Sequence, residues 1–390
     1  MAIGQLRRFR AVALAVFLIA PLTAAAAEPA TSGDARPKVI IDQDAAGPAG
    51  TDIQSMLMLI QAKDVDLLGI TVVTGDAWRN EEVSHTLRML EIAHRRAIPV
   101  VPGAVFPLLN TRRRTLAWEK LYGELFYDGA YMSRWPSENT VSWTPLHPTR
   151  PNWVPPLPEG EPTTHAADET AAAFLLRMVH RYPHQVTIIA AGPMTDLALA
   201  AELDPQFAAL AKQLVFMGGS FNPLPADTPF AQEYDNSPRQ EFNMRFDPEA
   251  ASIVLHQPWN DIIEVPVDPT SPTLMSHTLL AEVAKGKAPF DHYLARFGQV
   301  YPLWDETAVA VWLDPSLVKR EKTLLVDVDT AFTANYGATL SWPAGSGPDL
   351  GERPVHVVFT VDVPRLNSLV VRLLTAPEPI SLPRTRTSEK

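Results

Sequence analysis

Short apolar runs alternate along most of the chain with segments whose apolar residues recur three and four positions apart. Residues 39–41 predict a buried strand, and Ile53, Met56, Leu57 and Ile60 then predict a helix with one apolar face. Further strands are predicted at 66–73, 98–101, 186–191, 214–217, 262–267, 324–328 and 355–361, and further helices at 81–95, 168–181 (N-capped by Asp168) and 195–203. This alternation predicts an α/β fold with a mostly parallel central sheet and helices on both faces.

Two segments interrupt the pattern. Residues 134–163 carry eight prolines, a density that regular helix or central strand does not tolerate. We interpret this segment as an ordered surface insertion that walls a pocket, the alternative being an interdomain linker. Residues 222–236, after Gly218 and Gly219, form a second irregular segment of the kind that binding loops often use.

The first 27 residues have the layout of a signal peptide. Arg7, Arg8 and Arg10 precede an apolar run at 11–22 and a small-residue stretch at 23–27. The run is short for a bilayer span, so we expect cleavage near Ala27 and export to the periplasm or the medium, with an uncleaved anchor as the alternative. The rest is predicted to be a flexible tail at 28–37, a single domain at 38–375 and a C-terminal tail at 376–390.

The amino-acid composition limits which residues can bind a metal and which partners the protein can have. The chain has no cysteine, so any metal must be held by aspartate, glutamate or histidine. Its net charge is −11 and no basic cluster follows the leader, which argues against nucleic acid as a partner. No later segment is apolar enough for a transmembrane helix, so we expect no membrane contact after processing.

Carboxylates gather where the first strand meets the first helix. Asp42 and Asp44 end the strand and share a face, and Asp52 opens the helical pattern. In α/β folds ligands bind at the carboxyl ends of the strands. Clustered carboxylates there repel one another unless a hard cation such as calcium or magnesium neutralises them. A capped helix beside a solvated turn is the alternative explanation.

Eight segments, in order along the chain, resemble the motifs of the inosine–uridine preferring nucleoside hydrolase family. That family opens with D-x-D-x-G-x-D-D, and this chain has Asp42, Asp44, Thr51 and Asp52 in that region. The other similar segments are 69–76, 127–129, 191–198 (G-P-M-T-D), 217–220 (M-G-G-S), 241–243 (E-F-N), 247–251 (D-P-E-A-A) and 302–308 (P-L-W-D).

The resemblance implies an enzyme that hydrolyses the N-glycosidic bond of ribonucleosides or related N-ribosides. It implies one Ca²⁺, held by Asp44, Asp52, Asp305 and the backbone carbonyl of Thr195, with Asp44 as general base for a metal-activated water. It places five residues on the substrate, namely Thr51, Asp76, Glu241, Asn243 and Trp304. Asp42 and Asp196 would support the carboxylates from behind. Family members form dimers and tetramers, so a homo-oligomer is one option, and a proline-rich insertion that blocks such an interface is the alternative.

Four substitutions separate the chain from the family motifs. Thr51 stands where the family has an aspartate, Asp76 and Asp196 where it has asparagine, and Trp304 where some members have the histidine that protonates the leaving base. Three extra residues also separate Asp44 from Asp52. These departures keep two alternatives open: a hydrolase of another glycoside or modified sugar, and a non-catalytic calcium-stabilised binding protein. His85, His147, His165 and His292 could each supply the missing acid, and the sequence ties none of them to the site.

Overall fold

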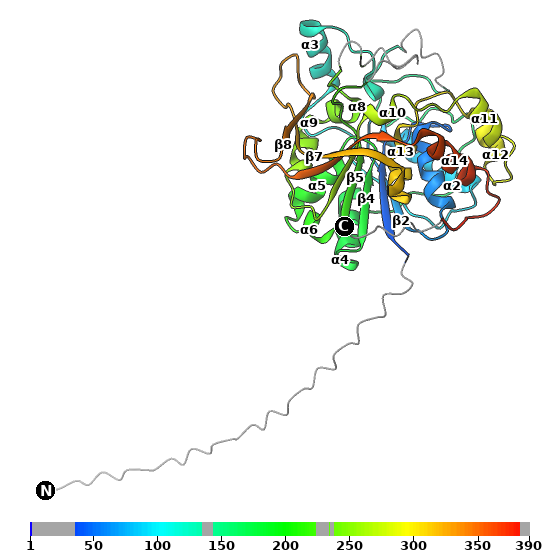
Figure 1. The fold of residues 1–390 in the computed structure, drawn as a ribbon, viewed down its shortest axis with the longest axis horizontal. Helices are drawn as coiled ribbons and strands as arrows, with labels where there is room; N and C mark the ends of the chain where they lie inside the picture. Colours follow the sequence, from blue (N-terminus) through cyan, green and yellow to red (C-terminus); the bar gives the residue numbers. More distant parts are fainter. Residues whose placement is uncertain (2–35, 135–142, 224–233, 235–237, 383–390) are drawn as a thin grey trace. The chain divides into compact units, whose positions relative to one another are not determined.

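A nine-stranded sheet runs through the protein in the order β3-β2-β1-β4-β5-β6-β9-β7-β8 (Figure 1). All neighbours from β3 to β9 are parallel, and β7 is antiparallel to both β9 and β8. The predicted α/β class with a mostly parallel sheet is therefore confirmed. The strands are β1 Lys38–Gln43, β2 Asp66–Val72, β3 Val100–Pro102, β4 Val186–Ala190, β5 Gln213–Met217, β6 Ile262–Val265, β7 Val318–Val328, β8 Thr339–Pro343 and β9 Pro354–Val361.

The structure, a computed structural model, describes Met1 and residues 36–134, 143–223, 234 and 238–382. Residues 36–390 form one compact unit. The predicted signal peptide lies outside the described residues, as does most of the irregular segment 222–236, so export stays a prediction. Among the described residues, no helix has the length and apolar character needed to cross a membrane.

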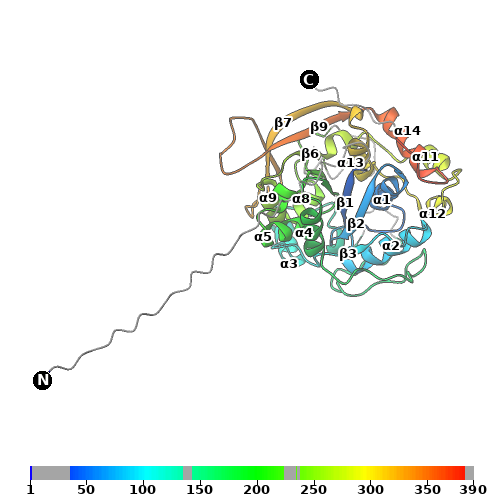
Figure 2. The ribbon, with the colours of Figure 1, turned by 90° about the horizontal axis from the view of Figure 1, so that it is seen from below.

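Helices cover both faces of the sheet, as the alternating pattern predicts (Figure 2). Val39 and Ile41 of β1 face one layer, and Ile40 faces the other. The first layer holds α1 Thr51–Gln61, α2 Arg79–Ile92, α11 His277–Val283, α12 Asp291–Phe297, α13 Trp304–Leu313 and α14 Val363–Leu374. The second holds α4 Ala171–Arg181, α5 Thr195–Leu203, α6 Phe207–Leu210 and α9 Pro248–Leu255.

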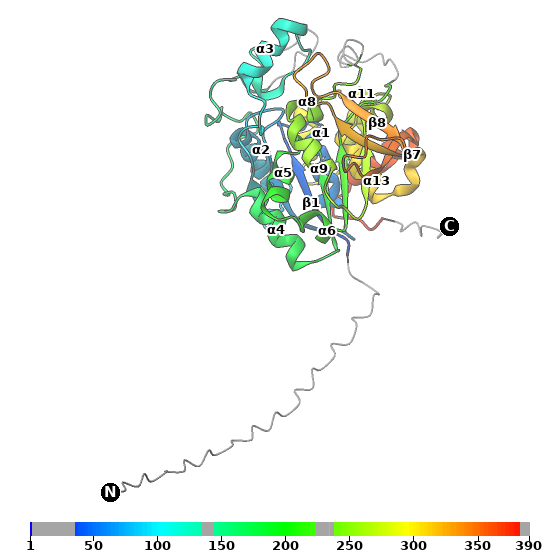
Figure 3. The same cartoon turned by 90° about the vertical axis from the view of Figure 1, so that its left-hand side faces the viewer.

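The remaining short elements include several at the end of the molecule toward which the strands run. Figure 3 shows α3 and α8 there, above the carboxyl ends of the strands. The elements not yet given are α3 Arg112–Tyr122, the 3₁₀ turn Gly129–Tyr131, α8 Phe242–Phe246, α10 Val267–Thr270 and the 3₁₀ turn Pro315–Leu317. In the register of the sheet, Asp42 of β1 lies between Thr71 of β2 and Ala190 of β4. The strand ends predicted to carry the chemistry therefore meet at one edge.

Three details differ from the predictions. The helix predicted from Asp168 begins at Ala171, and Thr170 is its N-cap, with the Thr170 hydroxyl accepting from the Ala173 amide. Strand β6 ends at Val265, because Pro266 and a new helical turn follow. Strand β7 begins at Val318, six residues before the predicted start. Its first half is charged and largely exposed, so the sequence there lacks the apolar signal of a strand.

Candidate active site

One pocket at the carboxyl edge of the sheet collects most of the predicted site residues. Asp44 enters from the end of β1, Asp52 from the first turn of α1, and Asp305 from the first turn of α13. Asp76 follows β2, and Glu241 caps α8. The predicted residues that line this pocket are Asp44, Thr51, Asp52, Asp76, Glu241, Asn243, Trp304 and Asp305.

Gln43, which sequence reasoning missed, links the Asp305 carboxylate to the backbone of Asp44 and Asp52. The Gln43 side-chain amide donates to Asp305 Oδ2 at 2.8 Å and to the Asp52 carbonyl at 3.4 Å, while Gln43 Oε1 accepts from the Asp44 backbone amide at 3.1 Å. Gln43 points to the face of β1 opposite to Asp42 and Asp44. That face is packed by α1 and α13, whose N-termini carry the other two carboxylates.

Two glycines make room for Asp44. A side chain at Gly75 would place its Cβ 2.0 Å from Asp44 Oδ2, and one at Gly192 would place it 2.8 Å from Asp44 Oδ1. Asp44 Oδ2 also accepts from the Asp76 backbone amide at 3.1 Å. The absence of a side chain at Gly75 and Gly192 therefore leaves the space that the Asp44 carboxylate occupies.

Burial and crowding raise the pKa of every carboxyl in this group. For Asp305, burial raises the pKa to about 7 despite hydrogen bonds with Gln43 and Asp52. For Asp76, burial and then the charge of Asp305 raise the pKa to about 7. Burial raises the pKa of Asp44 and Asp52 well above the ordinary range, with further contributions from Asp76 and Asp305. At neutral pH these groups need either protons or a cation.

The chemistry of this group fits a hard divalent ion, since it offers several carboxylate oxygens in one water-accessible pocket. Within the described residues, the trio with possible ligand atoms that all lie within 4.8 Å of one another consists of His256, Asp327 and Glu352. This trio does not include Asp44, Asp52 or Asp305. Joint coordination by Asp44, Asp52 and Asp305 would therefore require their side chains to draw together.

Thr195 is the predicted ligand that does not line the pocket. It is the first residue of α5, is buried, and its hydroxyl donates to Asp247 at 2.6 Å. Asp247 in turn caps α9 and accepts from the Leu108 amide at 2.9 Å. The Thr195 side chain thus ties α5 to α9, and the role of its carbonyl stays a prediction.

Comparison with known proteins decides the family. The inosine-uridine preferring nucleoside hydrolase pattern matches residues 39–368. The chain belongs to this family. It is 28% identical over 345 residues to uridine nucleosidase 1 of Arabidopsis thaliana, covering 84% of this chain and 89% of that protein. It is 30% identical to an uncharacterised Schizosaccharomyces pombe protein, covering 83% and 81% of the two chains.

Solved structures agree. A plant nucleoside hydrolase, the PpNRh1 enzyme, superposes with a TM-score of 0.66 at 26% identity, over 88% of this chain and 100% of that one. A purine-preferring ribonucleoside hydrolase from Gardnerella vaginalis shares the fold, with a TM-score of 0.63 at 20% identity over 87% and 98% of the two chains. The chain is thus a nucleoside hydrolase homologue, from a family that cleaves the N-glycosidic bond of ribonucleosides.

Three of the residues assigned to substrate in this nucleoside hydrolase already have partners in the protein. The Thr51 hydroxyl donates to Glu306 and accepts from the Asp305 amide at 3.2 Å. Glu241 accepts from the amides of Asn243, Met244 and Gly219, and the Asn243 side-chain amide donates to the Met217 carbonyl at 3.1 Å. These bonds fix the side chains in place. For Thr51, they show that the threonine holds the start of α13.

Aromatic side chains also line the pocket, and most of them were missed by sequence reasoning. Trp304 lies beside Tyr301, with ring centroids 6.4 Å apart, and Trp78 and Trp143 also line the pocket. Trp143 belongs to the described part of the proline-rich insertion, whose residues 143–147 all line the pocket. The interpretation of this segment as a pocket wall fits its position. The proline density predicts an ordered loop. That this loop reaches the pocket depends on tertiary packing, which the sequence does not show.

Asp42 and Asp196 do not line the pocket, and their support of the carboxylates stays a prediction. Both are buried; Asp42 accepts from the Thr71 hydroxyl, and Asp196 accepts from the Ala104 amide at 2.7 Å. Burial raises the pKa of Asp42 to about 7 despite hydrogen bonds with Thr71 and Asp196, while burial and the Asp42 charge raise the pKa of Asp196 well above its ordinary range. Two neighbouring buried carboxyl groups with raised pKa values are expected to share one proton near neutral pH.

Replacing Asp196 with asparagine, the residue in the family motif, should stabilise the protein at alkaline pH. The amide would donate permanently to Asp42, and no shared proton would be needed. We expect a gain of about 1–2 kcal/mol in unfolding free energy at pH 8 and little gain at pH 4.5. Denaturant titrations at the two pH values measure it, and an equal effect at both would contradict the shared proton.

Replacing Gln43 with leucine should loosen the carboxylate group without removing a carboxylate. We expect calcium affinity to fall about 10–100-fold, as for residues that orient metal ligands. The matched control is Gln61→Leu, because Gln61 is also buried and hydrogen-bonded, but to the carbonyls of Leu373 and Ala376 at the other end of α1. Calorimetric calcium titration compares the two, and equal affinities would refute the role of Gln43.

Proposed function

We propose that this protein is a calcium-dependent hydrolase of ribonucleosides, with water as the attacking group and Asp44 as the general base. The observation that carries the proposal is the meeting of carboxylates from β1, α1 and α13 in one pocket that aromatic side chains also line. The carboxylates suit a cation and ribose hydroxyls, and the aromatic rings suit a planar base. Among named relatives, Arabidopsis uridine nucleosidase 1 makes uridine the first substrate to test.

Asp44, Asp52 and Asp305 would hold the ion, which when bound lowers the pKa of a water molecule and orients it. Asp44 would take the proton of that water as it attacks the anomeric carbon. Negative charge from Asp76 and Glu241 would stabilise the positive charge that builds on the sugar. Asn243, fixed by the Met217 carbonyl, would hold a ribose hydroxyl.

The test offers the full chain, with calcium, a panel of uridine, cytidine, inosine and adenosine, and measures release of reducing sugar. We expect turnover of at least one nucleoside, its loss with EDTA, and its recovery on adding calcium. Asp305→Asn should lose calcium binding and activity together, whereas Asp349→Asn, on an exposed loop, should lose neither. Calcium binding without turnover of any nucleoside would refute the proposal and favour a binding protein.

A further inference from the structure

A histidine and two carboxylates from three separate elements come together outside the pocket. His256 is the C-cap residue of α9, Asp327 lies in β7, and Glu352 lies in the loop between β8 and β9. One possible ligand atom of each residue lies within 4.8 Å of the other two, and all three residues are partly buried. The pocket is lined by other residues. This cluster is therefore separate from the carboxylates of the proposed calcium site.

The histidine of this cluster presents one ring nitrogen to the carboxylates in the form that binds a metal. His256 Nδ1 lies 2.7 Å from the carbonyl oxygen of Ser252, one turn back along α9. A carbonyl oxygen only accepts hydrogen bonds, so Nδ1 carries a proton there. In a neutral imidazole the lone pair is then on Nε2, which lies 3.8 Å from Asp327 Oδ2. A backbone carbonyl on the other ring nitrogen is a usual partner of a metal-binding histidine.

The loop between β8 and β9 turns Glu352 toward the protein. Within residues 343–354, only Gly347 and Glu352 are not exposed. Glu352 Oε2 accepts from the Leu350 amide at 2.9 Å, while Glu352 Oε1 is buried and has no hydrogen-bond partner among the described residues. A buried carboxylate oxygen without a partner destabilises the protein, and a cation beside it would remove that cost.

The backbone around the cluster places the other ligand atoms. Gly351 has a φ of +113°, which residues with a side chain rarely adopt, and a Cβ there would lie 3.3 Å from His256 Cδ2. The glycine therefore lets the loop lie against the imidazole. Helix α9 packs against β7 (Figure 1). Asp327 Oδ1 accepts from the Val328 amide at 2.8 Å, which leaves Oδ2 toward His256.

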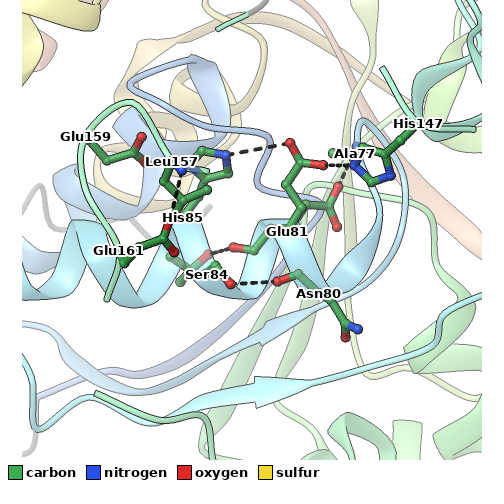
Figure 4. Close-up of polar contacts among 11 residues, drawn as sticks. Ala77, Asn80, Glu81, Ser84, His85, His147, Leu157, Glu159 and Glu161 are labelled. Carbon is green, nitrogen blue, oxygen red and sulfur yellow. Dashed lines mark hydrogen bonds and ion pairs between the residues drawn. The ribbon is translucent and has the colours of Figure 1, made fainter. Parts of the chain in front are cut away.

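The histidines and carboxylates between α2 and the proline-rich insertion are arranged differently (Figure 4). His147 Nε2 contacts Glu81 at 2.6 Å, and His147 Nδ1 lies 3.2 Å from the Arg150 carbonyl. His85 Nδ1 contacts Glu159. These three ring nitrogens are occupied by the protein itself, so that cluster fastens the insertion to α2. The cluster around His256 instead leaves ligand atoms for an ion.

We propose that His256, Asp327 and Glu352 bind one Zn²⁺ ion, which ties the loop between β8 and β9 to α9 and β7. One imidazole nitrogen with two carboxylate oxygens suits zinc, whereas calcium takes oxygen ligands alone. Ligand atoms of tetrahedral zinc lie about 3.3–3.6 Å apart, so movements of about 1.5 Å or less bring the three atoms into that range, with water as the fourth ligand. A second proton on His256 is the competing explanation of the same contacts.

The test titrates zinc into the full chain by calorimetry, with excess calcium present to occupy the carboxylates of the pocket. We expect one zinc ion per chain, and an affinity at least about 100-fold lower in His256→Gln and in Glu352→Gln, since each removes a ligand. His356→Gln is the matched control. His356 Nε2 lies 3.7 Å from Asp261 Oδ1, a similar pair that is not part of the cluster, so its loss should leave zinc affinity unchanged.

Thermal unfolding gives a second measurement. Zinc at 100 times its dissociation constant should raise the midpoint temperature by about 3–4 °C in the unmodified protein and in His356→Gln, and by much less in the two ligand variants. Nucleoside hydrolysis should be the same in all three variants, so this result does not depend on the proposed function.

Crystals of the unmodified protein grown with zinc locate the ion without any substitution. The anomalous map at the zinc edge should show a peak within about 2.0–2.2 Å of His256 Nε2 and of one oxygen from each carboxylate. Absence of zinc binding, a peak only elsewhere, or equal affinity in His256→Gln, Glu352→Gln and the unmodified protein would overturn the inference.

Discussion

Asparagine at position 44 is expected to lower kcat on the best nucleoside by about 10³-fold or more, since it removes the general base and one ligand of the ion together. The amide has the shape of the carboxyl group and can still accept from the Asp76 backbone amide, so the pocket keeps its geometry. Because Asp44 is buried among other carboxylates that raise its pKa, its neutral replacement should also leave the calcium-free protein as stable as before, or more so.

Steady-state kinetics and thermal unfolding without calcium measure the two effects. A fall in kcat without a fall in stability distinguishes loss of the base from misfolding, because a misfolded variant loses both activity and stability. Activity within about tenfold of the unmodified protein would contradict the role of Asp44 as base. A large loss of stability would instead show that its charge is satisfied within the protein.

The second large effect is on stability against pH. Burial raises the pKa of Asp76 and Asp305 to about 7, above the value of about 4 in an unfolded chain. The folded protein therefore binds more protons between these values, so stability is fully present below pH 4 and is lost as pH rises through 7. We expect the calcium-free protein to lose about 2–3 kcal/mol of unfolding free energy for each of these two carboxyl groups between pH 5 and pH 8.

Calcium should reverse this loss, because the ion replaces the protons. At 100 times its dissociation constant it adds about 2.7 kcal/mol at pH 8, and far less at pH 5, where protons compete for the same oxygens. His85 also contributes stability that is lost as pH rises from about 6.5, the value of an unfolded histidine, through its folded pKa of about 9, and this loss does not depend on calcium. Denaturant titrations at pH 5 and pH 8, with calcium and with EDTA, separate the contributions. A calcium effect equal at both pH values would contradict the linkage.

The sequence predicts the parts of the fold whose signal is local. Residues 39–41 and 66–73 are apolar runs in a buried parallel sheet, and they were placed within a residue or two. The charged first half of β7 was missed because its pairing with β9 depends on backbone bonds rather than on apolar side chains. Helix α14 was also missed, although Leu366, Val370 and Leu373 recur at helical spacing and are buried.

The site residues, too, include some that the sequence could predict and some that it could not. Asp44, Asp52 and Asp305 could be named because the family motifs mark them, and the structure brings all three into one pocket. Gln43 could not, because it contacts Asp305, which is 262 residues away in sequence. His147 was named only as one of four histidines, because its contact with Glu81 spans 66 residues. A lone glutamine or histidine in a sequence carries no mark of such a contact.

A crystal structure grown with calcium and measured for anomalous scattering tests the central claim most directly. We predict one strong peak in the pocket, within about 2.3–2.6 Å of carboxylate oxygens from Asp44, Asp52 and Asp305. A pocket without a peak, or a peak only at His256, Asp327 and Glu352, would contradict the account.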